Sequence, residues 1–253
     1  MIRIKNQKQI DGIRVSCKAL ARLYKLLIPQ VQAGMSTADI DDICVQYIKK
    51  IGGKPAWYSQ KFPGAACISI NEEVIHGIPS KKRIVQEGDL VSLDIGIDLA
   101  GYISDSAVTV PVGKVSKDAL DLLAVTGNCL SAGISACIAG NRVSDISRAV
   151  YNTAVSSGYG VVWEYCGHGV GLAVHEDPQI PNVPERGANP RIVPGMVLAI
   201  EPMINMGSGD VDVLDDNWTV VTQDRKVSCH MEHTVAVFPD HTEVLTQLDP
   251  GED

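Results

Sequence analysis

Aromatic residues are scarce in this chain: Phe, Trp and Tyr together make up 5% of the sequence, and only two positions are Phe. A core with so few rings must be built from aliphatic side chains. Hydrophobic residues still make up 45% of the 253 positions, which is enough for one large domain or two fused halves. We therefore expect a globular protein in which the few aromatic residues beside functional motifs are candidate pocket walls.

The sequence also lacks an excess of positive charge. It has 22 Lys and Arg against 30 Asp and Glu, a net charge of -8, and its basic residues are scattered apart from the short run at positions 81–83. Nucleic-acid binding requires a basic patch that attracts phosphates. We therefore expect no nucleic-acid partner.

Paired cysteines, a secretion signal and long apolar runs are missing as well. The seven cysteines are odd in number and irregularly spaced, without a C-x-x-C motif, and the N-terminal segment MIRIKNQKQIDGI has no apolar signal core. No run of about 18 or more uninterrupted apolar residues is present, which argues against a transmembrane span. These features predict a reduced, cytoplasmic protein that does not associate with a membrane.

What the sequence does contain is an internal similarity. Residues 33–40 and 139–146 both read Ala-Gly and then, five places after the glycine, Asp-Ile. Residues 88–94 and 195–201 both read glycine, apolar strand and, six places after the glycine, a carboxylate. Each match alone could arise by chance, but the offsets of 106 and 107 residues are nearly equal, which favours a duplicated half.

Hydrophobic periodicity predicts an α+β protein in which each half has a helix pair and a group of strands. We predict a single catalytic domain over residues 1–253, with pseudo-symmetric halves of about 1–112 and 113–253. Residues 181–190 are predicted to form a surface loop. The expected helices cover 6–31, 36–51, 117–139 and 143–157, and the expected strands cover 65–70, 90–97, 102–110, 196–205, 218–222 and 227–238.

Five residues of types that bind metals lie at or beside these apolar runs: Asp94, Asp105, His168, Glu201 and Glu232. Gathered together, four carboxylates and one imidazole form an oxygen-rich site for two divalent cations, which can share a bridging water and make it a nucleophile. Each residue alone has a simpler explanation, such as an acid on a solvated face or a hydrogen-bonded histidine. Together they indicate a dinuclear metal site and a hydrolytic reaction.

The first two acids flank a predicted hairpin. Residues 98–101 read Asp-Leu-Ala-Gly, and the glycine is free to take a positive φ. If the turn is centred there, Asp94 and Asp105 lie across from one another or one position off. An acid among Val, Leu and Ile side chains costs several kcal/mol unless it is compensated, and a metal ion would compensate both.

The motifs resemble those of the bacterial type I methionine aminopeptidases, in peptidase family M24. The resemblance covers essentially the whole chain and implies the creatinase-like, pita-bread fold, a curved antiparallel sheet flanked by helices in two pseudo-symmetric halves. The motifs that carry it are Cys-Ile-Ser-Ile-Asn-Glu at 67–72, His-Gly-Ile-Pro at 76–79, Asp-Ile-Gly at 94–96, Tyr-x-x-Asp at 102–105, Gly-His-Gly-Val-Gly at 167–171, His-Glu at 175–176, the run at 194–202 and Glu-His-Thr at 232–234.

The resemblance also implies the metal roles. Asp94 would chelate one ion, His168 and Glu201 the other, and Asp105 and Glu232 would bridge both. Glu201 would be the general base for a metal-bridging water. Co, Mn, Fe, Zn or Ni are all candidates, because availability rather than affinity often decides which metal is bound.

The substrate roles come from the same resemblance. His76 would contact the scissile amide or the amine, and His175 would polarise the carbonyl group. Phe62, Cys67 and Trp218 would line the methionine pocket. The implied reaction removes the N-terminal methionine of nascent proteins with a small second residue, by a monomer acting near the ribosome exit.

Two alternatives stay open. Proline-specific relatives, aminopeptidase P and prolidase, use the same five metal ligands but generally carry a large additional N-terminal domain. A non-catalytic binding module on this fold is the second alternative. The chain also departs from the family pattern: Ala56, Ser59 and Val174 stand where Cys, Tyr and Phe are common. These smaller residues are expected to widen the methionine pocket.

Overall fold

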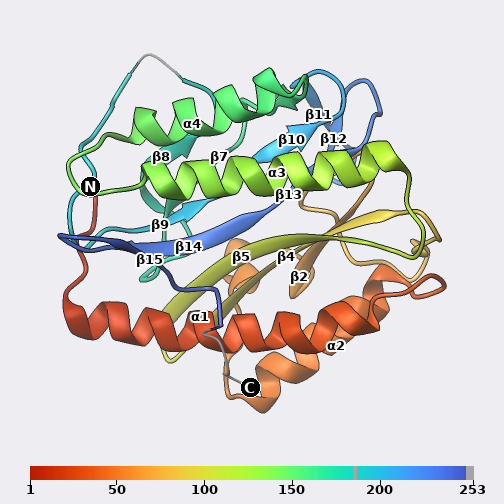
Figure 1. Cartoon of the computed structure of the whole chain (residues 1–253). Helices are drawn as coiled ribbons and strands as arrows, with labels where there is room; N and C mark the ends of the chain where they lie inside the picture. Colours follow the sequence, from red (N-terminus) through yellow and green to blue (C-terminus); the bar gives the residue numbers. More distant parts are fainter. Residues whose placement is uncertain (185–186, 249–253) are drawn as a thin grey trace.

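A curved sheet lies between two helix pairs in the computed structural model, which describes residues 1–184 and 187–248 (Figure 1). The helices are α1 (Gln7–Leu27), α2 (Thr37–Lys50), α3 (Lys117–Ala136) and α4 (Val143–Ser156), with short 3-10 turns η1 (Ile28–Gln30) and η2 (Ala56–Gln60). The strands are β1 (Lys54–Pro55), β2 (Ala66–Ile70), β3 (Glu73–Ile75), β4 (Leu90–Leu99), β5 (Tyr102–Pro111), β6 (Gly160–Val161), β7 (Cys166–Gly169), β8 (Glu176–Pro181), β9 (Val197–Ile200), β10 (Met203–Asn205), β11 (Val211–Val213), β12 (Val220–Thr222), β13 (Ser228–His230), β14 (Glu232–Val237) and β15 (Thr242–Val244).

The four predicted helices are present, and local hydrogen bonds explain where they begin. Asn6 caps α1 and Ser36 caps α2, in each case through a capping box that satisfies two otherwise unpaired backbone N–H groups. The predicted strand at 196–205 is instead split into β9 and β10 at Pro202, which has no N–H to donate to a ladder. The predicted strand at 227–238 is split at Met231 into β13 and β14.

Within the described residues, the main sheet has nine strands in the order β1-β4-β5-β14-β9-β7-β8, with β2 on β4 and β15 on β14. The antiparallel hairpin of β4 and β5 therefore lies beside the antiparallel pair β14 and β9. The two pairs join between β5 and β14, where Ala107 lies opposite Glu232 and Ser106 opposite His233. This junction brings residues from the two halves of the chain together.

The two matched pairs of segments have the same local structure. Gly34 and Gly140 both adopt left-handed backbones, with φ of 93° and 97°, and Gly88 and Gly195 do so with φ of 94° and 89°. Each glycine N–H also donates to a carbonyl at a corresponding place in its half, those of Val85, Ile192, Val112 and Val237 respectively. The predicted pseudo-symmetric architecture therefore extends to backbone conformation.

The hairpin between β4 and β5 differs from the prediction in register. Its two turn residues are Ala100 and Gly101, with φ of 54° and 84°, as a tight hairpin turn with two left-handed positions requires. The turn is thus centred one residue later than expected, so that Asp94 pairs with Ala107. Asp105 is a diagonal neighbour two positions away, and it lies on the same face because side chains alternate along a strand.

Aliphatic side chains fill the space between helices and sheet, as the composition predicts. Leu20 and Ile40 from the first helix pair pack in one buried cluster with Leu93 of β4. Ile146 of α4 and Leu198 of β9 belong to a corresponding cluster in the second half. None of the seven cysteines, all of them described residues, forms a disulfide, and six of them are buried.

Helix α3 is long and apolar enough to cross a membrane. The sequence analysis, which considered only uninterrupted apolar runs, predicted no transmembrane span. Core helices also meet this test, so one such helix is weak evidence for a span. Leu122 and Cys129 on α3 are buried in a cluster with Val150 of α4 and Ile204 of β10. Figure 1 shows α3 lying alongside α4.

Candidate metal centre and substrate cavity

All ten residues predicted to form the site line one cavity of about 200 Å³. They come from strands, turns and loops that are distant in sequence. The cavity is lined by Trp57, Gln60, Phe62, Cys67, Ile75, His76, Asp94, Asp105, Tyr165, Cys166, His168, His175, Glu201, Trp218 and Glu232.

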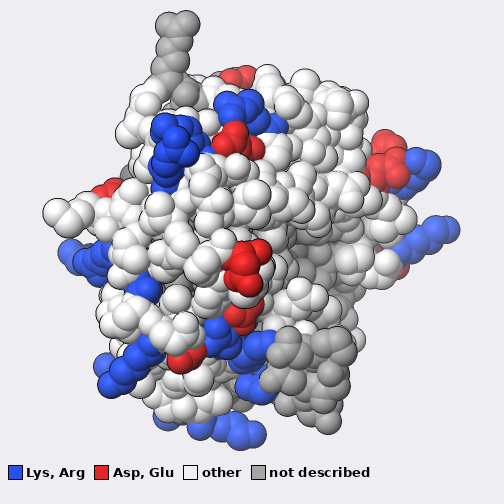
Figure 2. All heavy atoms as spheres, turned by 60° about the vertical axis from the view of Figure 1, so that its left-hand side comes forward, with Lys and Arg blue, Asp and Glu red and all other residues white. Residues whose placement is uncertain are grey.

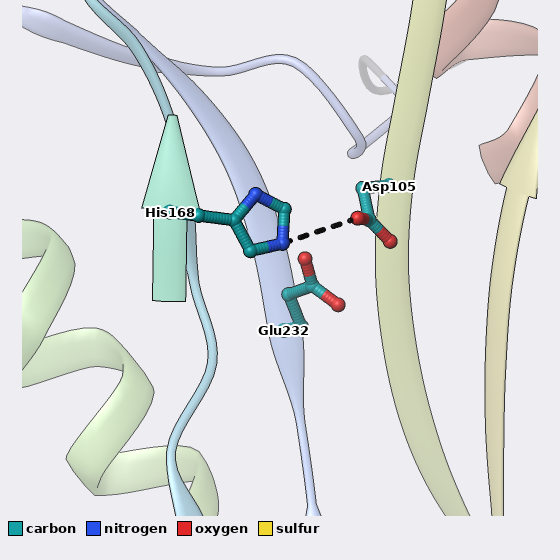
Figure 3. Close-up of side chains that lie close together, drawn as sticks. All are labelled: Asp105, His168 and Glu232. Atoms are coloured by element: carbon teal, nitrogen blue, oxygen red, sulfur yellow. Dashed lines mark ion pairs between the residues drawn. The ribbon is translucent and has the colours of Figure 1, made fainter. Parts of the chain in front are cut away.

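Four of the candidate ligands lie on strands of the main sheet, and the fifth, Glu201, directly follows β9. Figure 3 shows Asp105 on β5, His168 on β7 and Glu232 on β14 pointing toward one another, and one ligand atom from each lies within 4.8 Å of the others. His168 Nε2 is 3.6 Å from Asp105 Oδ2 and 3.4 Å from Glu201 Oε1. Asp94 on β4 completes the predicted five.

Hydrogen bonds beside the acids hold the supporting strands together. The Thr234 hydroxyl donates to the carbonyl oxygen of Asp105, and the Ser106 hydroxyl donates to that of Glu232, both at 2.7 Å. The hydroxyl of Tyr24 on α1 lies 2.5 Å from the carbonyl oxygen of Ser106. The backbone that carries the acids is therefore fixed by buried side chains rather than by solvent-exposed contacts.

The buried carboxylates lack the partners that buried acids require. Asp94 Oδ1, Asp105 Oδ1 and Glu232 Oε1 have no hydrogen-bond partner among the described residues, and no Lys or Arg lines the cavity. Leaving such groups unpaired is costly. Oxygen donors with free lone pairs are what hard divalent cations bind, so these residues fit a metal centre.

Burial and mutual repulsion favour the protonated acids in the absence of a cation. Burial raises the pKa of Asp94 to about 7. Burial and then the neighbouring carboxylates raise the pKa values of Asp105, Glu201 and Glu232 well above their usual range. A cation that binds here must displace protons, so its affinity falls as the pH falls.

His168 presents a free lone pair to the acids. Burial lowers its pKa to about 3, so the ring is neutral. Its Nδ1 lies 2.9 Å from the carbonyl oxygen of Gly169, which can only accept, so Nδ1 carries the proton. Nε2 is then the acceptor that faces Glu201 and Asp105, the tautomer that metal-ligating histidines use.

The glycines on both sides of His168 are required because other backbone segments approach them closely. A Cβ on Gly167 would lie 2.3 Å from the carbonyl oxygen of Ala199, and one on Gly169 would lie 2.3 Å from that of Asp177. Both distances are far inside van der Waals contact. Strand β7 can therefore fit between β9 and β8 only because these two positions lack side chains.

His76 and His175 line the same cavity as the ligand group. His76 has a left-handed backbone with φ of 59°, and burial lowers its pKa to about 4. Its ring lies 6.2 Å from that of Trp218. His175 is at the exposed mouth, with its ring 4.5 Å from that of His168, and partial burial lowers its pKa. Both rings are therefore neutral near pH 7.

Aromatic and apolar side chains wall the rest of the cavity. Phe62 and Trp218 meet edge to face with ring centroids 5.2 Å apart, and Cys67 is buried beside them. The sequence analysis missed Trp57, whose Nε1 donates to the carbonyl oxygen of Asp94 at 3.2 Å. Other lining residues that it missed are Gln60, Ile75, Tyr165 and Cys166.

The small residues at the three departures from the family pattern do not line this cavity. Ala56, Ser59 and Val174 line a neighbouring hollow of about 760 Å³, and Gln60 lines both spaces. The expectation that they widen the methionine pocket directly is therefore not met. Ala56 and Val174 do pack in the same buried cluster as Phe62. They therefore belong to the packing behind the cavity wall rather than to its lining.

Comparisons with known proteins identify the family of this chain. Residues 11–239 match metallopeptidase family M24. The methionine aminopeptidase of Treponema pallidum is 63% identical over 98% of this chain and 97% of its own length. The crystal structure of methionine aminopeptidase from Thermotoga maritima has a TM-score of 0.95 at 37% identity, covering 98% of this chain and 100% of that one.

A more distant structure shows the fold alone. Prolidase from Pyrococcus furiosus superimposes with a TM-score of 0.78 at 23% identity, and the match covers 97% of this chain but 66% of that one. With an α+β pita-bread architecture and a family match over most of its length, this chain belongs to metallopeptidase family M24.

Proposed function

We propose that this protein is a metal-dependent aminopeptidase that removes the N-terminal methionine of nascent proteins and prefers a small second residue. The observation that carries the proposal is the cavity itself, where four buried carboxylates, three of them with an oxygen that has no hydrogen-bond partner among the described residues, and a neutral imidazole adjoin an aromatic slot. The relatives named as methionine aminopeptidases match almost the whole chain. Their name supplies the substrate class.

The proposed metal roles follow the donor set. Asp94 would hold one cation, His168 and Glu201 the second, and Asp105 and Glu232 both. Two bound cations would polarise the scissile carbonyl and lower the pKa of a water held between them. Co, Mn, Fe, Zn and Ni are the candidate ions, and the proposal is for two of them.

Glu201 is proposed as the general base. Burial raises the pKa of its carboxyl group well above the usual range, which makes the carboxylate a stronger proton acceptor than an exposed glutamate. It would accept a proton from the attacking water and return a proton to the amine of the departing peptide. Its Oε1 lies 3.4 Å from His168 Nε2, inside the ligand group.

Two neutral histidines are proposed to contact the substrate. A neutral imidazole can donate one hydrogen bond, and the low pKa values of His76 and His175 keep both rings in that form. His175 would donate to the oxygen of the scissile carbonyl as negative charge develops, an interaction worth about 3 kcal/mol of barrier. His76 would contact the scissile amide or the substrate's amine.

The methionine side chain is proposed to enter the slot formed by Phe62, Cys67 and Trp218. A cavity of about 200 Å³ suits one side chain rather than a dipeptide. Residues 1–253 would act as a single catalytic domain with halves of about 1–112 and 113–253. The protein would be a cytoplasmic monomer that meets its substrates near the ribosome exit.

Removal of metal is expected to abolish hydrolysis of a Met-Ala-Ser peptide, because no other group in the cavity can lower the pKa of a water. The assay compares this peptide with an Xaa-Pro peptide, with chelator and after readdition of each divalent metal. Faster cleavage of the Xaa-Pro peptide would favour the prolidase alternative. Binding of either peptide without cleavage under any metal would favour a non-catalytic module.

We expect a modest loss of discrimination against other unbranched apolar residues. Ala56 and Val174 line a hollow behind the wall that holds Phe62. The wall can therefore shift to accommodate a substrate side chain whose shape differs from that of methionine. The measurement is kcat/KM for peptides that begin with Met, norleucine or Leu, with Ala56→Cys and Val174→Phe as the comparison variants. Strict dependence on Met in the natural protein would contradict the prediction.

A further inference from the structure

His230 is a buried histidine that the proposed mechanism does not use. It ends strand β13, its side chain is 2% exposed, and neither ring nitrogen has a hydrogen-bond partner among the described residues. A buried polar group without a partner is costly, because it has lost its hydrogen bonds to water. Its nearest ion-pair partner is Glu201, whose Oε2 lies 3.8 Å from His230 Nε2.

The backbone fixes where this ring points. The N–H of His230 donates to Thr109 Oγ1 at 3.2 Å, and the Thr109 hydroxyl donates to the carbonyl oxygen of His230 at 2.7 Å. On its other side the residue pairs with Met203 of β10, which follows Glu201 by two positions. Both edges of the residue are therefore held by neighbouring strands, and only its side chain is left without a partner.

The carboxylate of Glu201 consequently lies between two imidazoles. His168 Nε2 is 3.4 Å from Oε1, and His230 Nε2 is 3.8 Å from Oε2. The ring proton of His168 is on Nδ1, which donates to the carbonyl oxygen of Gly169, so Nε2 of His168 can only accept a hydrogen bond. A neutral His230 still has one N–H to donate, and the second carboxylate oxygen is the acceptor in front of it.

We infer that His230 is a positioning residue for Glu201, donating from Nε2 to Oε2 and thereby turning Oε1 toward the metal centre. The inference rests on the proposed role of Glu201. A hydrogen bond requires the two atoms to approach by about 1 Å from their present separation, which rotation of the Glu201 side chain can supply. Partners of this kind orient metal-binding side chains, and their loss typically costs about 10- to 100-fold in metal affinity or activity.

The test compares His230→Leu with His230→Gln. Leu has a similar bulk but no donor, whereas the amide nitrogen of Gln reaches about as far as Nε2. His233→Leu is the matched control, because His233 adjoins Glu232 in sequence but bonds Thr246 Oγ1 at 2.8 Å. Metal-free protein is titrated with Co²⁺ by calorimetry and visible absorption, and kcat and KM are measured on Met-Ala-Ser.

For His230→Leu we expect Co²⁺ affinity and kcat to fall by about 10- to 100-fold with KM little changed, and for His230→Gln we expect both to stay close to the natural protein. Natural affinity in the Leu variant, or equal losses in Leu and Gln, would overturn the inference. If the Leu variant does not fold, His230→Asn replaces it, since its amide is one carbon too short to reach. A natural protein that binds Co²⁺ but cleaves no Met peptide would refute the proposed function, while the affinity comparison would still decide the role of His230.

Discussion

Replacement of Glu201 by Gln is expected to lower kcat by about 10²- to 10⁴-fold, the usual contribution of a general base. The amide keeps the shape of the side chain but cannot accept the proton of the attacking water. The substitution also removes one negative charge from the ligand group. The measurement is steady-state hydrolysis of Met-Ala-Ser at saturating metal, with the metal content of each protein determined in parallel.

The fold should survive this change, because burial and the neighbouring carboxylates already disfavour the charged form of Glu201. We expect the melting temperature of metal-free Glu201→Gln to equal or exceed that of the natural protein. Glu164→Gln is the matched control, since Glu164 is an exposed acid close to the cavity residue Tyr165 in sequence. Natural turnover in Glu201→Gln would rule out the proposed base.

Glu176→Ala is expected to destabilise the protein by about 3–5 kcal/mol, because it leaves the buried charge of Lys5 without its ion-pair partner. The two side chains are 1% and 2% exposed, and Lys5 Nζ lies 2.9 Å from Glu176 Oε2. Burial lowers the pKa of Lys5, opposed by the hydrogen bond to Glu176. For a chain of this size the loss corresponds to a melting temperature lower by about 6–20 °C.

The same variant should weaken catalysis. Glu176 Oε1 accepts hydrogen bonds from the N–H groups of Leu172 and Ala173 at 2.7 and 3.0 Å. These bonds hold the conformation of the loop that carries His175. Thermal unfolding and kcat are measured on the same preparations.

Asp121→Ala is the matched control for charge removal, because its partner Lys117 is 82% exposed. Such exposed pairs contribute about 0–1 kcal/mol. Equal changes in melting temperature for Glu176→Ala and Asp121→Ala would contradict the importance of burial.

The long elements could be predicted because their signals are local. Helices α1, α2 and α3 combine apolar periodicity with a capping residue at the start, such as Ser36 three places before Asp39. Short strands such as β3, β7 and β11 were not predicted, because they lack local signals of this kind. Strand β7 covers four residues around His168 and contains two glycines, so it has no apolar alternation to recognise. It exists because β9 and β8 pair with it on both sides.

The site residues were predictable as residue types in a family pattern, but their neighbours were not. His230 lies two positions before Glu232, and alternation along a strand could have placed both on one face. That signal is weak, because alternation holds only within one strand and Met231 separates the strand of His230 from the strand of Glu232. Trp57 and Tyr165 could not be assigned to the cavity because nothing in their own segments shows which side they face.

By itself the sequence determined the helices, the repeated segments and the identity of the acids and histidines, because periodicity, caps and motifs depend on neighbouring residues. The tertiary structure alone decided the hairpin register of Asp94 and Asp105, the approach of His230 to Glu201 and the placement of Ala56 behind the wall. These features depend on strand order, on turn geometry and on which backbones can approach. Such contacts between distant segments leave no local signal in the chain.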